Sequence, residues 1–178
     1  MQRYLPLRRY ICRRVVIKLV NCKTKQDAER VILAYGHAVQ SLAFTFLKNR
    51  QDAEDTAQDV FVTYLTKSPE FESVQKEKAW LMQVTVNRCK SLLRRSCRTE
   101  LPLTEDLSYL PREEYDLIHA MLALDEKYRL PLHLHYYEGY SLAEIGKLLK
   151  CSPATVGSRL FRARDKLKNE LGDDYFEE

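Results

Sequence analysis

The sequence has little of what interrupts helices, since only 5 of its 178 residues are glycine and 6 are proline. Because both residue types break helical structure, their scarcity predicts a mainly helical protein. With 45% hydrophobic and 30% charged residues, the chain can form hydrophobic cores and is typical of a soluble protein. Its length suffices for one domain or for two small ones.

Long apolar runs are also missing, and none approaches the roughly 20 residues that cross a bilayer. Paired arginines precede the apolar residues 15–20, as they do in an export signal. However, Lys18 interrupts this stretch and no small-residue cleavage pattern follows it. We therefore expect residues 1–25 to be a basic N-terminal extension and the protein to be cytoplasmic.

Several signatures of chemistry are absent. The five cysteines form no Cys-x-x-Cys pair, and their scattered spacing favours reduced thiols over a disulfide framework or a zinc site. There is no Gly-rich phosphate loop, and no nucleophile and base stand out, so the sequence predicts neither an enzyme nor a cofactor. Asp52, Asp55 and Asp59 are candidates for metal ligands, but helix capping and an exposed acidic face explain them better.

Charge is unevenly distributed along the chain, although the net charge is only +4. Residues 1–25 contain many cations and no acid, and residues 86–98 contain five cations and no acid. The charged residues within 100–126 are mostly acidic, and so are those from Glu170 onward. This segregation indicates separate surfaces with separate roles.

Three helices are predicted in a first domain, residues 26–97. Apolar residues recur at steps of three and four over residues 26–47, which places them on one helical face. Asp52 is expected to cap a second helix, which ends at Ser68-Pro69 because proline disfavours a helical residue before it. A third helix is expected over residues 76–95.

The second helix carries an apolar stripe (Ala53, Ala57, Val60, Phe61, Tyr64) and another, largely polar stripe (Asp55, Gln58, Asp59, Val62).

Residues 98–112 contain two prolines, three acids and no clear period, and are predicted to be a flexible linker. A second small helical domain is expected over residues 113–172, followed by an acidic tail at 173–178. Its predicted helices cover residues 113–124, 126–137, 141–149 and 153–171. Pro131 falls inside one of them and is expected to kink it. The predicted fold is therefore all-α, with two helical domains.

The second domain ends in a predicted helix-turn-helix. Ser141 and Glu144 form a capping box, and Ser152 caps the last helix with Pro153 at its first position. Leu142, Ile145 and Leu149 are expected to face inward from the shorter helix. The last helix has an inner stripe of Val156, Leu160, Ala163 and Leu167. A neighbouring face carries Thr155, Arg159, Arg162 and Lys166, which favours DNA binding over a merely solvated surface.

Two residues of the third helix are weaker candidates for a functional contact. Trp80 is more often part of a core than a platform on which bases stack. Asn87 has poor helix propensity and no local structural reason to be there, which hints at a contact.

Two sets of motifs resemble a known family. The stretches "DAEDTAQDVFVTYL" and "AWLMQVTVNRCKSLLRR" are similar to region 2 of the extracytoplasmic-function (ECF) group of bacterial RNA polymerase sigma factors. The stretch "KYRLPLHLHYYEGYSLAEIGKLLKCSPATVGSRLFRARDKL" is similar to region 4. Both sets occur in the expected order, and the resemblance covers residues 26–171.

The resemblance implies a transcription factor that binds core polymerase, recognises and melts promoters, and is not an enzyme. Region 2 would bind the clamp helices of the largest polymerase subunit, and region 4 the polymerase flap. The implied polymerase contacts are Asp55, Gln58, Asp59 and Phe61. The implied contacts to the −10 promoter element are Trp80, Asn87, Arg88, Lys90, Arg94 and Arg95. The implied contacts to the −35 element are Thr155, Ser158, Arg159, Arg162 and Lys166.

The resemblance also implies an anti-sigma factor as a partner, often a membrane-tethered one. One position departs from the family, since many members have a lysine where this chain has Gly157. The main alternative is a stand-alone helix-turn-helix regulator whose first domain dimerises; a polymerase-sequestering protein is a further one. An acidic polymerase-binding face on the second helix is needed only under the sigma interpretation.

Overall fold

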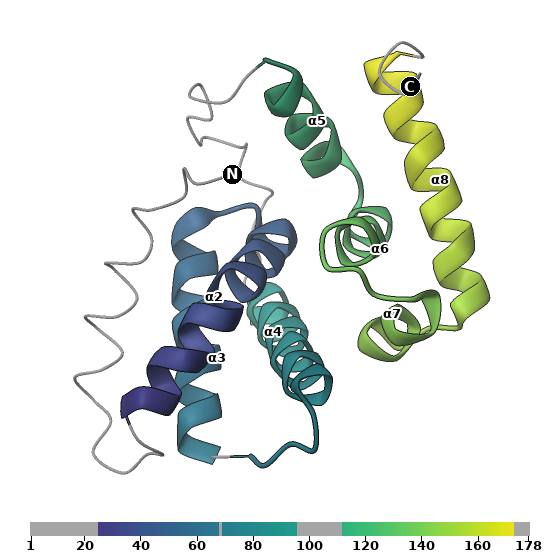
Figure 1. Ribbon diagram of the computed structural model, residues 1–178. Helices are drawn as coiled ribbons and strands as arrows, with labels where there is room; N and C mark the ends of the chain where they lie inside the picture. The colour runs from purple at the N-terminus through teal and green to yellow at the C-terminus, as the bar shows by residue number, and fades with distance from the viewer. Residues whose placement is uncertain (1–24, 68, 96–111, 173–178) are drawn as a thin grey trace. The chain divides into compact units, whose positions relative to one another are not determined.

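The computed structural model describes residues 25–67, 69–95 and 112–172, which form seven α-helices and no strand (Figure 1). The predicted all-α fold is confirmed. Two compact units divide the chain, the first made of residues 1–44 and 50–97 and the second of residues 45–49 and 98–178. Most of the predicted N-terminal extension and linker, and the whole acidic tail, lie outside the described residues. None of the described helices is long and apolar enough to span a membrane.

The first unit contains α2 (Lys25–Leu47) up to Phe44, α3 (Arg50–Lys67) and α4 (Val74–Arg95). The predicted apolar stripe of α3 is buried throughout, and α3 packs directly on α4. In α4, Leu93 is only half-buried, whereas Met82, Val86 and Cys89 are fully buried. The buried side chains of α2 and α4 in this unit include Ala28, Val31, Ile32, Tyr35, Val39, Leu42, Leu81, Met82, Val86 and Cys89.

Two helix starts differ from the prediction. The helix α3 begins at Arg50, so Asp52 lies in its first turn and is not its cap. There its charge still interacts favourably with the positive end of the helix. The helix α4 begins at Val74, two residues before the predicted start, because the Ser73 hydroxyl accepts a hydrogen bond from the Lys76 N–H at 3.2 Å.

The second unit contains α5 (Arg112–Ala123), α6 (Glu126–Tyr136), α7 (Leu142–Leu149) and α8 (Pro153–Leu171). The long helix α8 packs against the other three helices. Its predicted inner stripe of Val156, Leu160, Ala163 and Leu167 is buried. Pro131 does not interrupt α6, which starts only five residues earlier, so that the missing N–H removes a single hydrogen bond near the helix start.

A buried arginine joins two helices of the second unit. Arg129 of α6 is 3% exposed, and its Nη1 donates to the carbonyl oxygen of Leu122 at 3.1 Å and to that of Leu124. These carbonyls lie at the end of α5, where the last turn of a helix leaves its acceptors without partners. The Arg129 guanidinium therefore caps the C-terminal end of α5 and holds α6 against it.

A buried carboxylate joins all three helices of the first unit. Glu77 of α4 is 5% exposed. Its two carboxylate oxygens accept hydrogen bonds from both Nη atoms of Arg30 on α2, at 3.0 and 2.8 Å. Two hydroxyl groups donate to the same carboxylate, that of Tyr35 on α2 at 2.8 Å and that of Tyr64 on α3 at 2.5 Å. We call these four side chains the Glu77 network.

The network changes the titration of its members. Hydrogen bonds from Arg30 lower the pKa of Glu77 from 4.5 to about 2, although burial acts in the opposite direction. Burial and the hydrogen bond to Glu77 raise the pKa of Tyr64 from 10.0 to about 12. Glu77 is therefore charged and both tyrosines are neutral donors at physiological pH, which is the combination that satisfies every member.

We predict that Glu77→Gln lowers the free energy of unfolding of the first unit by about 3 kcal/mol at pH 7, the equivalent of its pKa shift. Because the folded pKa lies below 4.5, the carboxylate stabilises the fold fully above that pH and loses its effect as the pH falls towards 2. The difference in unfolding free energy between the parent protein and Glu77→Gln is thus expected to disappear in acid. Urea unfolding followed by the fluorescence of Trp80, the single tryptophan, measures it.

Glu72→Gln is the matched control, because the Glu72 side chain is 83% exposed and its ion-pair partner among the described residues is Lys76, one turn away. Its expected effect is below about 0.5 kcal/mol. Equal destabilisation by both substitutions would contradict the role of the Glu77 network.

Candidate nucleic-acid and protein interfaces

The helix-turn-helix predicted from the sequence is formed by α7 and α8. The Ser141 side chain accepts a hydrogen bond from the Glu144 N–H, and the Glu144 carboxylate accepts one from the Ser141 N–H at 2.9 Å, which completes the capping box. Ser152 caps α8 by accepting from the Thr155 N–H at 3.1 Å, and Pro153 is the first helical residue. Local sequence signals therefore determine where both helices begin.

The turn between the helices depends on a close backbone approach. Lys150 ends α7 in the left-handed conformation, with φ of 59°. The Cys151 N–H then donates to the Gly146 carbonyl at 2.9 Å. A Cβ atom at Gly146 would lie 2.7 Å from the Cys151 carbonyl oxygen, so only glycine fits there without a backbone shift.

One of the predictions for the inward-facing side of α7 is wrong. Leu142 is 37% exposed, whereas Ile145 and Leu148 are buried. Leu142 lies in the first turn of a short helix, and its Cδ1 points towards α8, 3.8 Å from the place of a Cβ at Gly157. The predicted inward-facing Leu149 is half-buried.

The predicted −35 contacts follow one another along α8, next to its buried stripe. Thr155 is half-buried and its Oγ1 lies 2.8 Å from the Ser152 Oγ. Ser158 is exposed and donates to the Ala154 carbonyl. The half-buried Arg159 has its Nη1 3.8 Å from the Cys151 Sγ, in the turn.

The two remaining cations of this face are exposed. The Nζ of Lys166 lies 5.8 Å from the ring centroid of Tyr128, a residue of α6. Arg162, between Arg159 and Lys166, extends from the helix with its side chain accessible. It is therefore the arginine of this face most available for a contact with DNA.

The acidic residues proposed from the resemblance lie on the outer side of α3. Asp55 is exposed and accepts a hydrogen bond from the Gln51 Nε2 at 3.1 Å. Asp59, one turn later, is also exposed, and Gln58 is half-buried. Phe61 is 0% exposed and belongs to the core. Its side chain is therefore not accessible for the polymerase contact that the resemblance implies.

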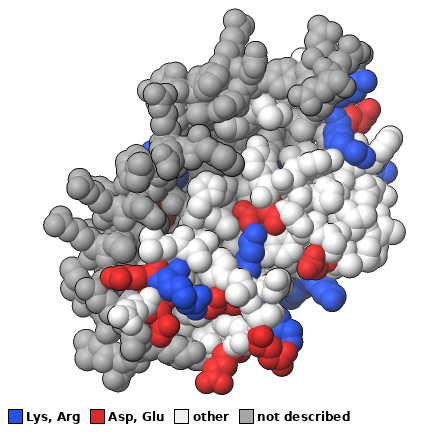
Figure 2. All heavy atoms as spheres, viewed as in Figure 1, with Lys and Arg blue, Asp and Glu red and all other residues white. Residues whose placement is uncertain are grey.

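Charge is mixed on the surface. On the face shown in Figure 2, basic and acidic side chains of the described residues are interspersed. Some form pairs within a helix, such as Arg50 and Glu54 at 3.0 Å. Within the described residues, no group of three potential ligand side chains could hold a metal ion.

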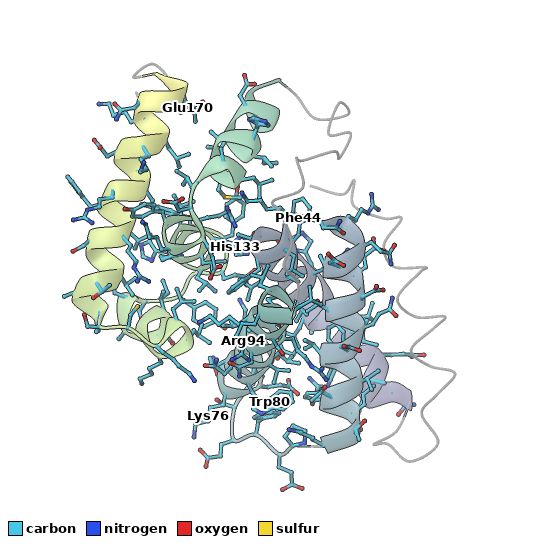
Figure 3. All side chains as sticks on the ribbon, turned by 180° about the vertical axis from the view of Figure 1, so that it is seen from behind. Phe44, Lys76, Trp80, Arg94, His133 and Glu170 are labelled. Carbon is cyan, nitrogen blue, oxygen red and sulfur yellow. The ribbon has the colours of Figure 1, made fainter. Side chains whose placement is uncertain are left out.

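Trp80 packs within an aromatic cluster. Its ring meets that of Tyr64 edge-on, with centroids 5.9 Å apart, and lies 5.9 Å from that of Phe71 in the preceding loop. Figure 3 shows Trp80 and Lys76 near the loop that leads into α4, with Arg94 farther along the helix. Trp80 therefore supports the loop before α4.

The other proposed −10 contacts lie on the second half of α4. Asn87 is exposed, and its Oδ1 accepts from the Gln83 Nε2 at 3.3 Å. Arg88 and Arg94 are exposed and Lys90 is half-buried. The side chain of Arg95 lies outside the part that the structure describes.

Asn87 borders an open groove of about 450 Å³ between α3 and α4. The helix α3 forms much of this groove. Its other lining residues are Val62, Thr63, Thr66, Lys67, Val84 and Arg88. Sequence analysis missed the α3 side, although the exposed Val62 in the polar stripe was a signal for it.

Comparison with known proteins identifies both units. The model of sigma-70 region 2 matches residues 31–99, and the model of sigma-70 region 4 matches residues 115–167. The chain is 24% identical to the RNA polymerase sigma-H factor of Pseudomonas aeruginosa, over 88% of this chain and 92% of that protein. It is 27% identical to the ECF sigma factor SigW of Bacillus subtilis, over 85% and 92%. The chain belongs to the ECF group of RNA polymerase sigma factors.

Solved structures share the fold of this sigma factor. The sigma factor RpoE of Bartonella quintana, in complex with the anti-sigma factor NepR, has a TM-score of 0.69 and 24% identity, covering 84% of this chain and 99% of RpoE. CnrH, in complex with the cytosolic domain of CnrY, has a TM-score of 0.62 and 22% identity, covering 90% and 94%. The alternative of a stand-alone regulator is not favoured, because both sigma regions match in order. The domain boundaries at 26–97 and 113–172 stay predictions.

Two glycine substitutions in this sigma factor are predicted to have opposite effects. Gly146→Ala is expected to destabilise the second unit by about 1–3 kcal/mol, because the new methyl group would overlap the Cys151 carbonyl. Gly157→Ala meets only an ordinary contact with Leu142 and is expected to stabilise α8 by up to about 1 kcal/mol. Urea unfolding followed by far-ultraviolet circular dichroism compares them. A Gly146→Ala protein that is as stable as the parent would show that the close approach in the turn is not limiting.

Proposed function

We propose that this sigma factor binds core polymerase through the outer face of α3 and contacts promoter DNA through α4 and α8. The observation that supports this division is that α3 and α8, in units matching regions 2 and 4, each bury an apolar stripe and expose a polar one. The exposed stripe is acidic on α3 and cationic on α8. Helices held by a core present their outer side chains in a defined geometry, which specific recognition requires.

The −35 element is proposed to be recognised by α8 in the major groove, as in other helix-turn-helix proteins. Arg162 is the proposed base-edge contact, since an exposed arginine can form a bidentate pair with guanine. Thr155, near the capped start of α8, and Ser158 can contact base edges or phosphates. Arg159 and Lys166, which already lie against Cys151 and Tyr128, are better suited to phosphates that set the register.

The −10 element is proposed to bind along α4. Promoter opening requires an unstacked base to be held outside the duplex. The groove at Asn87 offers an amide, two threonine hydroxyls and apolar valine surfaces, a combination that suits a base. Arg88, Lys90, Arg94 and Arg95 are proposed to hold the phosphate backbone, and Trp80 to support the loop from within its aromatic cluster.

Asp55, Gln58 and Asp59 are proposed to contact the clamp helices of the largest polymerase subunit. Their exposure on one side of α3 leaves them accessible to a cationic partner surface. Region 4 is proposed to contact the polymerase flap. The protein is proposed to act in the cytoplasm, without catalytic activity of its own.

An anti-sigma factor is proposed as a further partner. The structures of RpoE and CnrH each contain a sigma factor in complex with another protein, NepR or CnrY. NepR is named as an anti-sigma factor, and the part of CnrY present is its cytosolic domain. We propose that a protein of this kind, in a soluble or a membrane-tethered form, controls this sigma factor by covering its polymerase-binding surfaces.

Arg162→Ala is predicted to weaken transcription from the promoters that this sigma factor uses by about 5- to 150-fold, the range for one bidentate base contact. The loss is expected to depend on the base at one −35 position. Transcription in vitro on promoters varied in the −35 element measures this. The control is Arg164→Ala, which removes an exposed cation outside the predicted −35 set. Equal losses in both variants at every base would remove Arg162 from sequence recognition.

Charge reversal on α3 is predicted to weaken polymerase binding strongly. Asp55→Lys and Asp59→Lys together are expected to reduce affinity for core polymerase by roughly 30-fold or more, because like charges then face each other across the interface. Glu126→Lys, at the exposed start of α6, is the control with the same type of charge change. Binding of labelled protein to purified core measures the effect. Unchanged affinity in the double variant would show that α3 does not bind polymerase.

A further inference from the structure

The proposed polymerase-binding face and the proposed −10 face touch each other at one ion pair. The Oδ2 of Asp59 on α3 lies 3.7 Å from the Nη1 of Arg88 on α4, and both side chains are partly exposed, at 63% and 49%. The Nη2 of Arg88 also donates to the Thr63 Oγ1 at 3.4 Å. A residue expected to bind polymerase therefore holds a residue expected to bind DNA.

We propose that Asp59 restrains Arg88 in the free sigma factor, and that polymerase releases Arg88 for a DNA phosphate by pairing with Asp59. This inference rests on the proposed function of α3 and α4. A cation on the polymerase surface near Asp59 would repel Arg88 and compete for the same carboxylate. The long side chain of Arg88 is half-exposed and can rotate away from α3 without disturbing the core.

The position of Arg88 makes it suitable for such a switch. It lines the groove that also contains Asn87, so that a released guanidinium is placed beside the proposed site of the unstacked base. Of the described cations Arg88, Lys90 and Arg94, Arg88 is the one that a carboxylate of α3 reaches. Polymerase binding would thereby increase affinity for DNA at the place where the strands separate.

The expected effect is modest, because partly exposed ion pairs contribute little. Loss of the Asp59 carboxylate is expected to increase the affinity of the free protein for single-stranded DNA by about two- to five-fold. Since Arg88 would then neutralise one more phosphate, the slope of log affinity against log salt concentration is expected to steepen by about 0.7.

The test compares Asp59→Asn with Asp55→Asn. Each substitution removes one negative charge from the same face of α3, but Asp55 accepts from Gln51 and does not contact Arg88. The full chain is titrated against a fluorescein-labelled single strand of twelve mixed nucleotides, and binding is followed by anisotropy at several salt concentrations. Arg88→Ala and the double variant Asp59→Asn with Arg88→Ala complete a mutant cycle.

We expect Asp59→Asn to bind the strand more tightly than Asp55→Asn, and the gain to vanish when Arg88 is replaced by alanine. Equal affinities of Asp55→Asn and Asp59→Asn would overturn the inference, and so would a gain that persists without Arg88. Affinity for core polymerase is measured on the same samples. If neither asparagine variant loses polymerase affinity, α3 does not bind polymerase through this face. Polymerase then cannot be the partner that releases Arg88. If both lose it while the DNA results are equal, only the inference fails.

Discussion

The buried carboxylate of Glu77 is the interaction on which the first unit depends. A charge that is 5% exposed is tolerated only when donors surround it, and here they come from both helices that pack beside α4. Arg30 provides the compensating charge, and the two tyrosines satisfy the remaining acceptor positions. Because these donors are fixed in direction, the network determines how α2, α3 and α4 are placed along one another, which apolar packing alone specifies less strictly.

That placement has consequences for both proposed surfaces of the unit. Tyr64 contributes its hydroxyl to Glu77 and its ring to the cluster with Phe71 and Trp80, so the network also supports the loop before α4. Between α3 and α4, the Oδ2 of Asp59 lies 3.7 Å from the Nη1 of Arg88, and Arg88 also lines the groove at Asn87. The second unit uses local devices instead, since caps and a tight glycine turn orient α8.

The features predicted best from sequence are those encoded within a few residues. The capping box at Ser141, the cap at Ser152 and the three- and four-residue spacing of the α8 stripe all act locally, so the helix-turn-helix is predicted almost to the residue. Helix starts that depend on less regular caps, such as Ser73, were missed by two residues. The family resemblance came from the same local motifs, and the comparisons support it.

What sequence reasoning missed depends on contacts between distant residues. Arg30 and Glu77 are separated by 47 positions, and neither has a local pattern that marks it as buried or paired. Phe61 matched a family motif, but motif membership does not distinguish a core residue from a surface contact. The groove at Asn87 arises from the crossing of α3 and α4, which no single helix predicts. The assignment of individual residues to polymerase and DNA stays a prediction.

Run-off transcription from fragmented genomic DNA, with purified core polymerase in the presence and absence of this protein, tests its role in initiation most directly. We expect discrete new transcripts whose templates share two upstream sequence blocks, one for each unit. Transcription that does not change on addition of the protein, together with DNA binding by the protein alone, would contradict a role as a sigma factor and indicate a stand-alone regulator.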